Sequence, residues 1–257
     1  MALHGISHTK IPHPPRESQP YLDKTDLHQM LSWLSRRFRF LNPDQFLNGE
    51  KDGVLLTFDD GFANNFTNVL PLLEEFNAPA VFFISTQHVS EPGNWLPATM
   101  KMAQLGWGHE KDIPREIAID CYNGMSEEQL RVAARNPLVT VGSHSVSHPF
   151  LSQVPTSQLK FELESSRKYL QKISSQAVDL FAYPTGDYNR VVAEAVRDYG
   201  YRSAFAMDPL SVGLLGFEIP RVGIYEPHSY YLSLKLSGLH RRPFNCSSIP
   251  GSTNYDK

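Results

Sequence analysis

Short apolar segments that alternate with helical stretches are the feature that most constrains the fold of this chain. A strand that is buried on both faces is a short apolar run, and strands that alternate with helices indicate a parallel sheet. At 257 residues, this pattern favours a closed or nearly closed α/β barrel. The segments predicted as strands are residues 54–58, 80–84, 138–142, 178–183, 201–206 and 221–225, and the predicted helices are residues 25–37, 64–76, 126 onward, 156–174 and 189–199.

The remaining segments predict the domain organisation. Residues 1–24 are expected to form an extended N-terminal segment, because prolines cluster between residues 7 and 20. A single domain is expected over residues 25–240, with an insertion of poor periodicity at about residues 86–124. Residues 241–257, rich in Ser, Asn, Gly and Pro, are expected to form a flexible tail.

Composition excludes several classes of function. No run approaches the roughly 18–20 apolar residues that a membrane-spanning helix needs, so an integral membrane protein is not expected. Lys and Arg total 24 against 27 Asp and Glu, without a basic block, so nucleic acid is not an expected partner. The start lacks a signal-peptide pattern, so the chain as given is expected in the cytoplasm, although a trimmed secreted or periplasmic protein would look the same. Oligomeric state does not follow from the sequence.

Polar residues follow three of the predicted strands. Asp59 and Asp60 come after residues 54–58, His144 and His148 come after residues 138–142, and a Tyr-Pro-Thr-Gly turn ends the strand at 178–183. In a barrel of parallel strands, functional groups collect where the strands end. We therefore expect two carboxylates, two imidazoles and a rigid turn at the same rim.

The spacing of these groups indicates a divalent metal site. His144 and His148 are four positions apart, which would place both rings on one side of a helical turn. Two imidazoles and one carboxylate leave a coordination position open for water, as catalytic sites do. The alternatives are that the His spacing is a coincidence among 10 histidines, and that Asp59-Asp60-Gly61 is only a turn.

Two motifs together resemble a known family. Thr57-Phe58-Asp59-Asp60-Gly61 and Ser143-His144-Ser145-Val146-Ser147-His148-Pro149 are similar to the paired signature of the polysaccharide deacetylase family, the NodB-homology domain of carbohydrate esterase family 4. The resemblance extends over roughly residues 54–225. It implies a distorted, incomplete (β/α) barrel, TIM-like, with about seven strands.

The resemblance also implies roles for individual residues. Asp59 matches the general base, and Asp60, His144 and His148 match the metal ligands. The backbone N–H of Thr185 matches the donor that stabilises the oxyanion. The implied reaction is metal-dependent hydrolysis of N-acetyl groups on a carbohydrate, which yields acetate and a free amine. Zn²⁺ is the expected ion, and Co, Ni, Fe or Mn would suit the same ligands.

Two departures from the family pattern concern catalytic groups. Ala182 stands where the family places an Arg that orients the base, and Arg221 is expected to supply this charge from another strand. The family's general acid, a late His, has no clear match, because only His228 and His240 lie in that region. The residue that protonates the leaving amine therefore stays unassigned.

Residues near the rim suggest a subgroup and a substrate surface. The Tyr-Pro-x-Gly form of the turn and Leu3-His4-Gly5 are similar to family members that act on poly-N-acetylglucosamine. Tyr183, Pro184 and, in the insertion, Trp95 are expected to contact sugar. The alternatives are a deformylase acting on a lipid-linked sugar, a small-amide hydrolase of the same fold, and a catalytically inactive carbohydrate-binding barrel.

Overall fold

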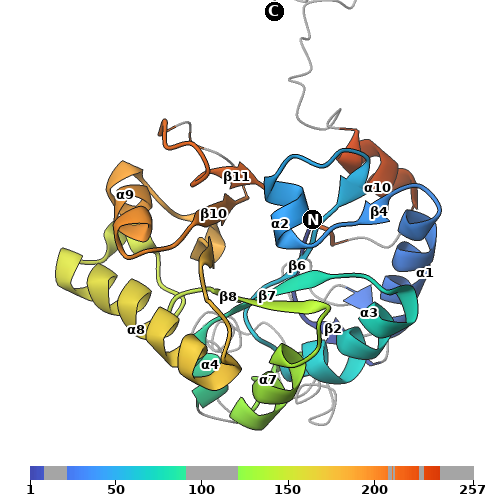
Figure 1. The fold of residues 1–257 in the computed structure, drawn as a ribbon, viewed down its shortest axis with the longest axis horizontal. Helices are drawn as coiled ribbons and strands as arrows, with labels where there is room; N and C mark the ends of the chain where they lie inside the picture. The colour runs from blue at the N-terminus through green and yellow to red at the C-terminus, as the bar shows by residue number, and fades with distance from the viewer. Residues whose placement is uncertain (9–21, 91–120, 208–209, 211, 226–228, 238–257) are drawn as a thin grey trace, which may run out of the picture.

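A seven-stranded parallel sheet forms the centre of the molecule (Figure 1). The computed structural model describes residues 1–8, 22–90, 121–207, 210, 212–225 and 229–237. Neighbouring strands follow the order β1-β6-β7-β8-β9-β10-β11, and every pair is parallel. The strands are β1 (Ala2–Leu3), β6 (Leu56–Phe58), β7 (Ala80–Ile84), β8 (Val139–Ser143), β9 (Leu180–Ala182), β10 (Ser203–Ala206) and β11 (Ile219–Pro220).

The two edges of this sheet meet, so the sheet curls into an irregular barrel. Ala2 in β1 forms an isolated parallel bridge with Gly223, just after β11. The N–H of Ala2 donates to the carbonyl of Val222 at 2.8 Å, and the N–H of Ile224 donates to the carbonyl of Ala2 at 2.9 Å. A single bridge, rather than a strand ladder, joins the edges. The expected distorted, incomplete (β/α) barrel is therefore confirmed.

Most of the helices lie around the outside of the sheet, whereas α2 lies nearer the centre of the view in Figure 1. Ser126 and Gln129 form the reciprocal capping box that their spacing predicts. The helices are α1 (Lys24–Ser35), α2 (Pro43–Leu47), α3 (Leu70–Phe76), α4 (Thr86–Ser90), α7 (Glu127–Ala134), α8 (Thr156–Ser174), α9 (Arg190–Asp198) and α10 (Ser229–Leu236), with a π-helix η1 (Asn65–Val69) and short 3₁₀ turns η2 (Leu151–Gln153) and η3 (Pro184–Gly186).

Alternation along the strands separates two apolar cores. Successive side chains of a strand point to opposite faces, so Phe82 and Ile84 join the large core beneath the helices, whereas Val81 and Phe83 belong to a smaller cluster. That cluster also contains Leu55, Leu180, Ala182 and Phe205. Gly142 makes room for the Phe83 ring, since a Cβ at this position would lie 2.5 Å from ring atoms.

Several boundaries differ from those predicted. The apolar run at 54–58 is divided, because β5 (Gly53–Val54) pairs with β4 (Arg39–Phe40) and only β6 joins the main sheet. The predicted strand at 221–225 lies earlier, at β11, which places Arg221 just past the strand end. Helix α1 begins after Asp23, whose side chain forms a capping box with Asp26.

The N-terminal residues take part in the domain. Residues 1–24 are expected to precede it as an extended segment, but β1 lies beside β6 in the main sheet, with Ala2 and Leu3 fully buried. The apolar pair is buried because β1 fills the gap between β6 and the segment after β11. A further short pair, β2 (Ile6–Ser7) and β3 (Leu22–Asp23), follows.

Some expectations fall on residues outside the described ranges. Most of the insertion at 86–124 and the tail at 241–257 are among them, as are Trp95, His228 and His240. Within the described ranges, no helix has the length and apolar character needed to cross a membrane.

Candidate active site

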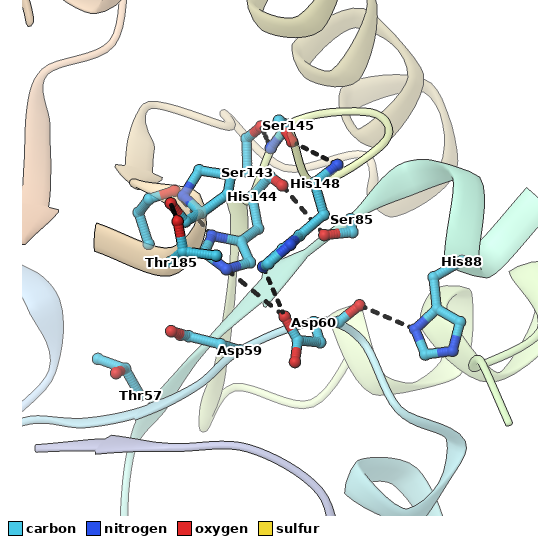
Figure 2. Close-up of polar contacts among 12 residues, drawn as sticks. Thr57, Asp59, Asp60, Ser85, His88, Ser143, His144, Ser145, His148 and Thr185 are labelled. Carbon is cyan, nitrogen blue, oxygen red and sulfur yellow. Dashed lines mark hydrogen bonds and ion pairs between the residues drawn. The ribbon is translucent and has the colours of Figure 1, made fainter. Parts of the chain in front are cut away.

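The carboxyl ends of five strands bring polar residues to one rim of the barrel. These ends belong to β1, β6, β8, β9 and β11. The residues that follow them are His4, Asp59 with Asp60, His144, the turn at 183–186, and Arg221. Five segments that are distant in sequence therefore supply one site, part of which is drawn in Figure 2.

Asp60, His144 and His148 converge at this rim. The Oδ1 atom of Asp60 lies 3.5 Å from Nε2 of His144 and 3.4 Å from Nε2 of His148 (Figure 2). One ligand atom from each residue lies within 4.8 Å of the other two. The structure thus brings together the three residues that the motifs single out as metal ligands.

The protonation of the imidazoles suits a cation between these atoms. Nδ1 of His144 lies 2.7 Å from the carbonyl oxygen of Ala182, which can only accept, so Nδ1 carries the proton and Nε2 has a free lone pair. Burial lowers the pKa of His144 to about 3, so the ring is neutral at pH 7. Burial also lowers the pKa of His148. The ring of His144 therefore presents a lone pair, not a proton, to the carboxylate.

The carboxylate itself also fits a metal. Oδ1 of Asp60 is buried and has no hydrogen-bond partner in the part of the chain that the structure describes. Burial raises the pKa of Asp60 to about 6, against an opposing effect of His4; the nearby Asp59 adds to the rise, and Arg221 opposes it least. A buried carboxylate oxygen that has no donor and faces an imidazole lone pair is unfavourable unless a cation joins them. The three residues fit a divalent ion.

A loop, not a helix, brings the two histidines together. The expected helical turn is not formed, because Ser145 and His148 adopt left-handed backbone conformations with φ of 67° and 58°. The segment after β8 folds back on itself instead, and the ring centroids of His144 and His148 lie 4.9 Å apart. A tight loop, and not a helical turn, therefore brings together two histidines that are four positions apart.

Arg221 pairs with Asp59 through both oxygens. Its Nη1 donates to Oδ1 at 2.6 Å and its Nη2 donates to Oδ2 at 2.7 Å, and both side chains are buried. Nη1 also donates to Oγ1 of Thr57 at 2.9 Å. The guanidinium therefore pairs with Asp59 from the end of another strand, as expected from the Ala at position 182.

This pairing keeps Asp59 ionised. Burial would raise the pKa of Asp59, but the charge and hydrogen bonds of Arg221, helped by His144, outweigh it and lower the pKa to about 2. Asp59 and Asp60 are adjacent in sequence, yet their pKa values shift in opposite directions. Neighbouring carboxyls with separated pKa values are a mark of catalytic sites.

The turn after β9 exposes Thr185. Its backbone is left-handed, with φ of 55°, which is uncommon for a residue with a side chain. The N–H groups of Gly186 and Asp187 donate to backbone carbonyls within the turn, whereas the N–H of Thr185 donates to no backbone acceptor in the described ranges. Strained backbone of this kind is concentrated at functional sites.

Tyr183 and Pro184 lie in the interior, which corrects the expectation that they contact sugar. Tyr183 is 1% exposed, and its hydroxyl donates to the carbonyl of Phe217 at 2.9 Å. Its ring stacks on Tyr188 with centroids 4.3 Å apart. Pro184 is also buried. The tyrosine at this strand end is therefore part of the core, and Thr185 is the exposed residue of the turn.

Two buried polar residues near the site are not predicted by the motifs. His88 on α4 is 1% exposed and lies between two carbonyl oxygens, 3.2 Å from that of Asp60 and 3.0 Å from that of Tyr122. Glu162 on α8 is also 1% exposed and accepts hydrogen bonds from the loop between the two histidines. Glu162 had a sequence signal, since it is a charged residue on the apolar side of an amphipathic helix.

Comparison with known proteins shows which family and which proteins the chain resembles. Residues 47–204 match the family model described as polysaccharide deacetylase. A protein of Bacillus subtilis, provisionally named a polysaccharide deacetylase, is 23% identical over 72% of this chain, which spans 53% of that protein. The poly-beta-1,6-N-acetyl-D-glucosamine N-deacetylase of Staphylococcus aureus is 23% identical over 86% of this chain and 73% of its own length.

The fold agrees with this assignment. The solved structure of a de-N-acetylase from Aggregatibacter actinomycetemcomitans superposes with a TM-score of 0.69, covering 91% of this chain and 97% of that chain at 18% identity. The fold and the Asp-His-His rim thus define a hydrolase-type α/β barrel with a candidate metal centre. Because the family model matches more than half of its residues, the chain belongs to the polysaccharide deacetylase family.

Proposed function

We propose that this protein is a metal-dependent carbohydrate N-deacetylase, which hydrolyses N-acetyl groups with Asp59 as the general base. The observation that carries the proposal is the convergence of Asp60, His144 and His148 beside an ionised Asp59, in a chain of this family. A divalent ion held there, with Zn²⁺ the first choice, would supply Lewis acidity and lower the pKa of a bound water.

The protein's own residues divide the remaining work. The carboxylate of Asp59, held by Arg221, accepts the proton of the attacking water. The exposed N–H of Thr185 donates to the oxygen that gains negative charge as the amide carbonyl is attacked. Arg221 does not touch the substrate in this scheme; it orients Asp59 and keeps it charged.

His4 is our candidate for the group that protonates the leaving amine. It follows β1 at the same rim, and its charge lowers the pKa of both Asp59 and Asp60. Its ring lies against Tyr225, with centroids 6.0 Å apart, and its Nδ1 has no hydrogen-bond partner among the described residues. An imidazole is the type of group that can donate a proton to a leaving amine in general acid catalysis.

The substrate is proposed from the relatives. Two named relatives are deacetylases of polysaccharide, and the Staphylococcus protein acts, by its name, on poly-β-1,6-N-acetylglucosamine. We infer a polymeric N-acetylated sugar of that class as the first substrate to test.

The deciding experiment measures acetate release. The purified protein would be stripped with a chelator, reloaded with Zn²⁺, Co²⁺, Ni²⁺, Mn²⁺ or Fe²⁺, and offered poly-β-1,6-N-acetylglucosamine and chitin oligosaccharides. We expect acetate from the reloaded protein and none from the stripped protein. A deformylase would release formate from an N-formylated sugar instead. Binding of sugar without release of either acid would indicate an inactive carbohydrate-binding barrel.

A further inference from the structure

Glu162 places a carboxylate in the interior of the protein, behind the loop that carries His148. It lies on α8, on the side of the helix that packs against the sheet, with Leu159, Leu163 and Ser166 buried beside it. A charged group in such a place costs desolvation energy, and a well-packed apolar residue often serves stability equally well. Its presence therefore calls for a role other than general stability.

The carboxylate binds the loop at three points. Its Oε2 accepts from the N–H of Val146 at 2.8 Å and from the N–H of Ser147 at 2.9 Å. Its Oε1 accepts from the hydroxyl of Ser147 at 2.6 Å. Bonds to a charged acceptor are roughly twice as strong as neutral ones. Three such bonds fix the backbone of the two residues that precede His148.

A second link fixes the start of the same loop. The hydroxyl of Ser166, one turn after Glu162 on α8, lies 2.9 Å from that of Ser143. The N–H of Ser145 donates to Oγ of Ser143 at 3.3 Å, and the N–H of His148 donates to Oγ of Ser145 at 3.0 Å. One face of α8 thus holds both ends of the segment between the histidines.

The two imidazoles differ in how they are oriented. The ring of His144 is held by the bond between its Nδ1 and the carbonyl of Ala182. Nδ1 of His148 is buried but has no hydrogen-bond partner in any other described residue. Metal-binding histidines ordinarily donate this second nitrogen to a carbonyl or carboxylate, which fixes the ring. No other described residue gives His148 such a bond, so its ring position depends on its backbone.

That backbone is itself strained. His148 has φ of 58°, a left-handed conformation that persists only where the surroundings enforce it. The bonds from Glu162 to Val146 and Ser147 end directly before this residue. The enforcing contacts and the strained residue are therefore adjacent.

We propose that Glu162 is a positioning residue that holds His148 in the metal site through the backbone of Val146 and Ser147. This inference rests on the proposed function, since it takes His148 as a metal ligand. Glu162 touches neither metal nor substrate. Its hydrogen bonds to the main chain fix the position of the His148 ring, which a hydrogen bond to Nδ1 would otherwise fix.

The test is a double-mutant cycle read by metal affinity. Zn²⁺ dissociation constants, measured by chelator competition, would be compared for the wild type, Glu162→Met, His148→Ala and the double variant. We expect Glu162→Met to weaken Zn²⁺ binding by roughly 10–100-fold, as loss of an outer-shell partner does. In the His148→Ala background, the same change should have little effect, because the residue through which it acts is gone.

Conservative variants separate positioning from folding. Glu162→Gln keeps an oxygen for the two N–H groups, and its amide can donate to the Ser147 hydroxyl, so we expect affinity near that of the wild type. Glu164→Met is the matched control, because Glu164 lies on the same helix but pairs with the exposed Lys168. If Glu162→Met does not fold, Glu162→Asp, which withdraws the carboxylate by one methylene, is measured in the same cycle, and we expect intermediate weakening.

The Co²⁺-loaded protein gives an independent measurement. The visible absorption of Co²⁺ reports its coordination, so the spectrum of Glu162→Met should approach that of His148→Ala. Equal Zn²⁺ affinity in Glu162→Met and the wild type, or equal weakening in both backgrounds of the cycle, would overturn the inference while leaving the proposed function intact. A wild-type protein that binds no divalent ion would overturn both.

Discussion

The guanidinium of Arg221 donates two hydrogen bonds, of 2.6 and 2.7 Å, to the carboxylate of Asp59, although 162 positions separate the residues. The two side chains leave the carboxyl ends of β11 and β6. The pair is buried, so each charge depends on the other for compensation.

Replacing Arg221 with Met should lower the free energy of unfolding of the protein. Asp59 would remain as an uncompensated buried charge, which typically costs about 3–5 kcal/mol. Urea unfolding of the metal-free protein measures the loss. Adding Asp59→Asn to Arg221→Met should restore part of the stability, because the orphaned charge is removed. An Arg221→Met variant as stable as the wild type would contradict the importance of the pair.

Asp59→Asn alone should remove activity and retain metal. The amide cannot accept the proton of water as a carboxylate does, so we expect turnover to fall by at least roughly 10²-fold. Asp60, His144 and His148 are unchanged, so metal content after purification should match that of the wild type. Elemental analysis and acetate release check the two halves of this prediction. Near-normal turnover would mean that Asp59 is not the base.

Removing the metal should lower stability, and His144→Ala should abolish this dependence. A ligand at 100 times its dissociation constant stabilises the folded state by about 2.7 kcal/mol if it does not bind the unfolded chain. Thermal unfolding of stripped and Zn²⁺-loaded protein measures the difference as a rise of several degrees in Tm. His144→Ala should show the same Tm with and without Zn²⁺. Lys168→Ala, on the surface of α8, is the control that should keep the response.

Lowering the pH should destabilise the metal-free protein at pH values above those at which most surface carboxyls become protonated. Burial lowers the pKa of His144 from 6.5 to about 3, so below pH 6.5 the unfolded chain takes up a proton that the folded chain refuses. His88 and His148 act in the same direction, since burial lowers the pKa of each. Asp60, with its pKa raised to about 6, opposes them as one group against three. The free energy of unfolding should therefore decline from pH 7 to pH 5.

The same measurement of stability against pH in His144→Gln tests whether the His144 imidazole contributes to this decline. Without that imidazole, the decline between pH 7 and pH 5 should be shallower. A curve parallel to that of the wild type would show that the loss comes from other groups.

His4→Gln should slow the reaction without loss of metal. Loss of a general acid lowers turnover by roughly 10²–10⁴-fold. Metal content and Tm should stay those of the wild type. Unchanged turnover would remove His4 from the scheme.

The strands and the candidate metal ligands could be predicted from sequence because local patterns encode them. Apolar runs such as residues 80–84 are buried on both faces wherever they fall in a parallel sheet, and β7 occupies that range. Asp60, His144 and His148 follow such runs directly, so the ends of β6 and β8 determine where they lie.

Features set by tertiary packing were harder to predict. Nothing local in the sequence distinguishes a helical turn from the left-handed loop at 144–148, because the loop is held by α8, a separate element. Tyr183 stands at a strand end like a rim residue, yet the stacking with Tyr188 and the bond to Phe217 draw it into the core. The pairing of Arg221 with Asp59 could be proposed only because Ala182 stands where the family pattern has an Arg.

The bridge between Ala2 and Gly223 has a consequence for biosynthesis. Contacts between the two ends of a domain form late, because the intervening chain must first be ordered. A nascent chain that stops short of residue 221 lacks both the neighbour of β1 and the counter-charge of Asp59. The rim is therefore completed only after residues 221–223 have left the ribosome.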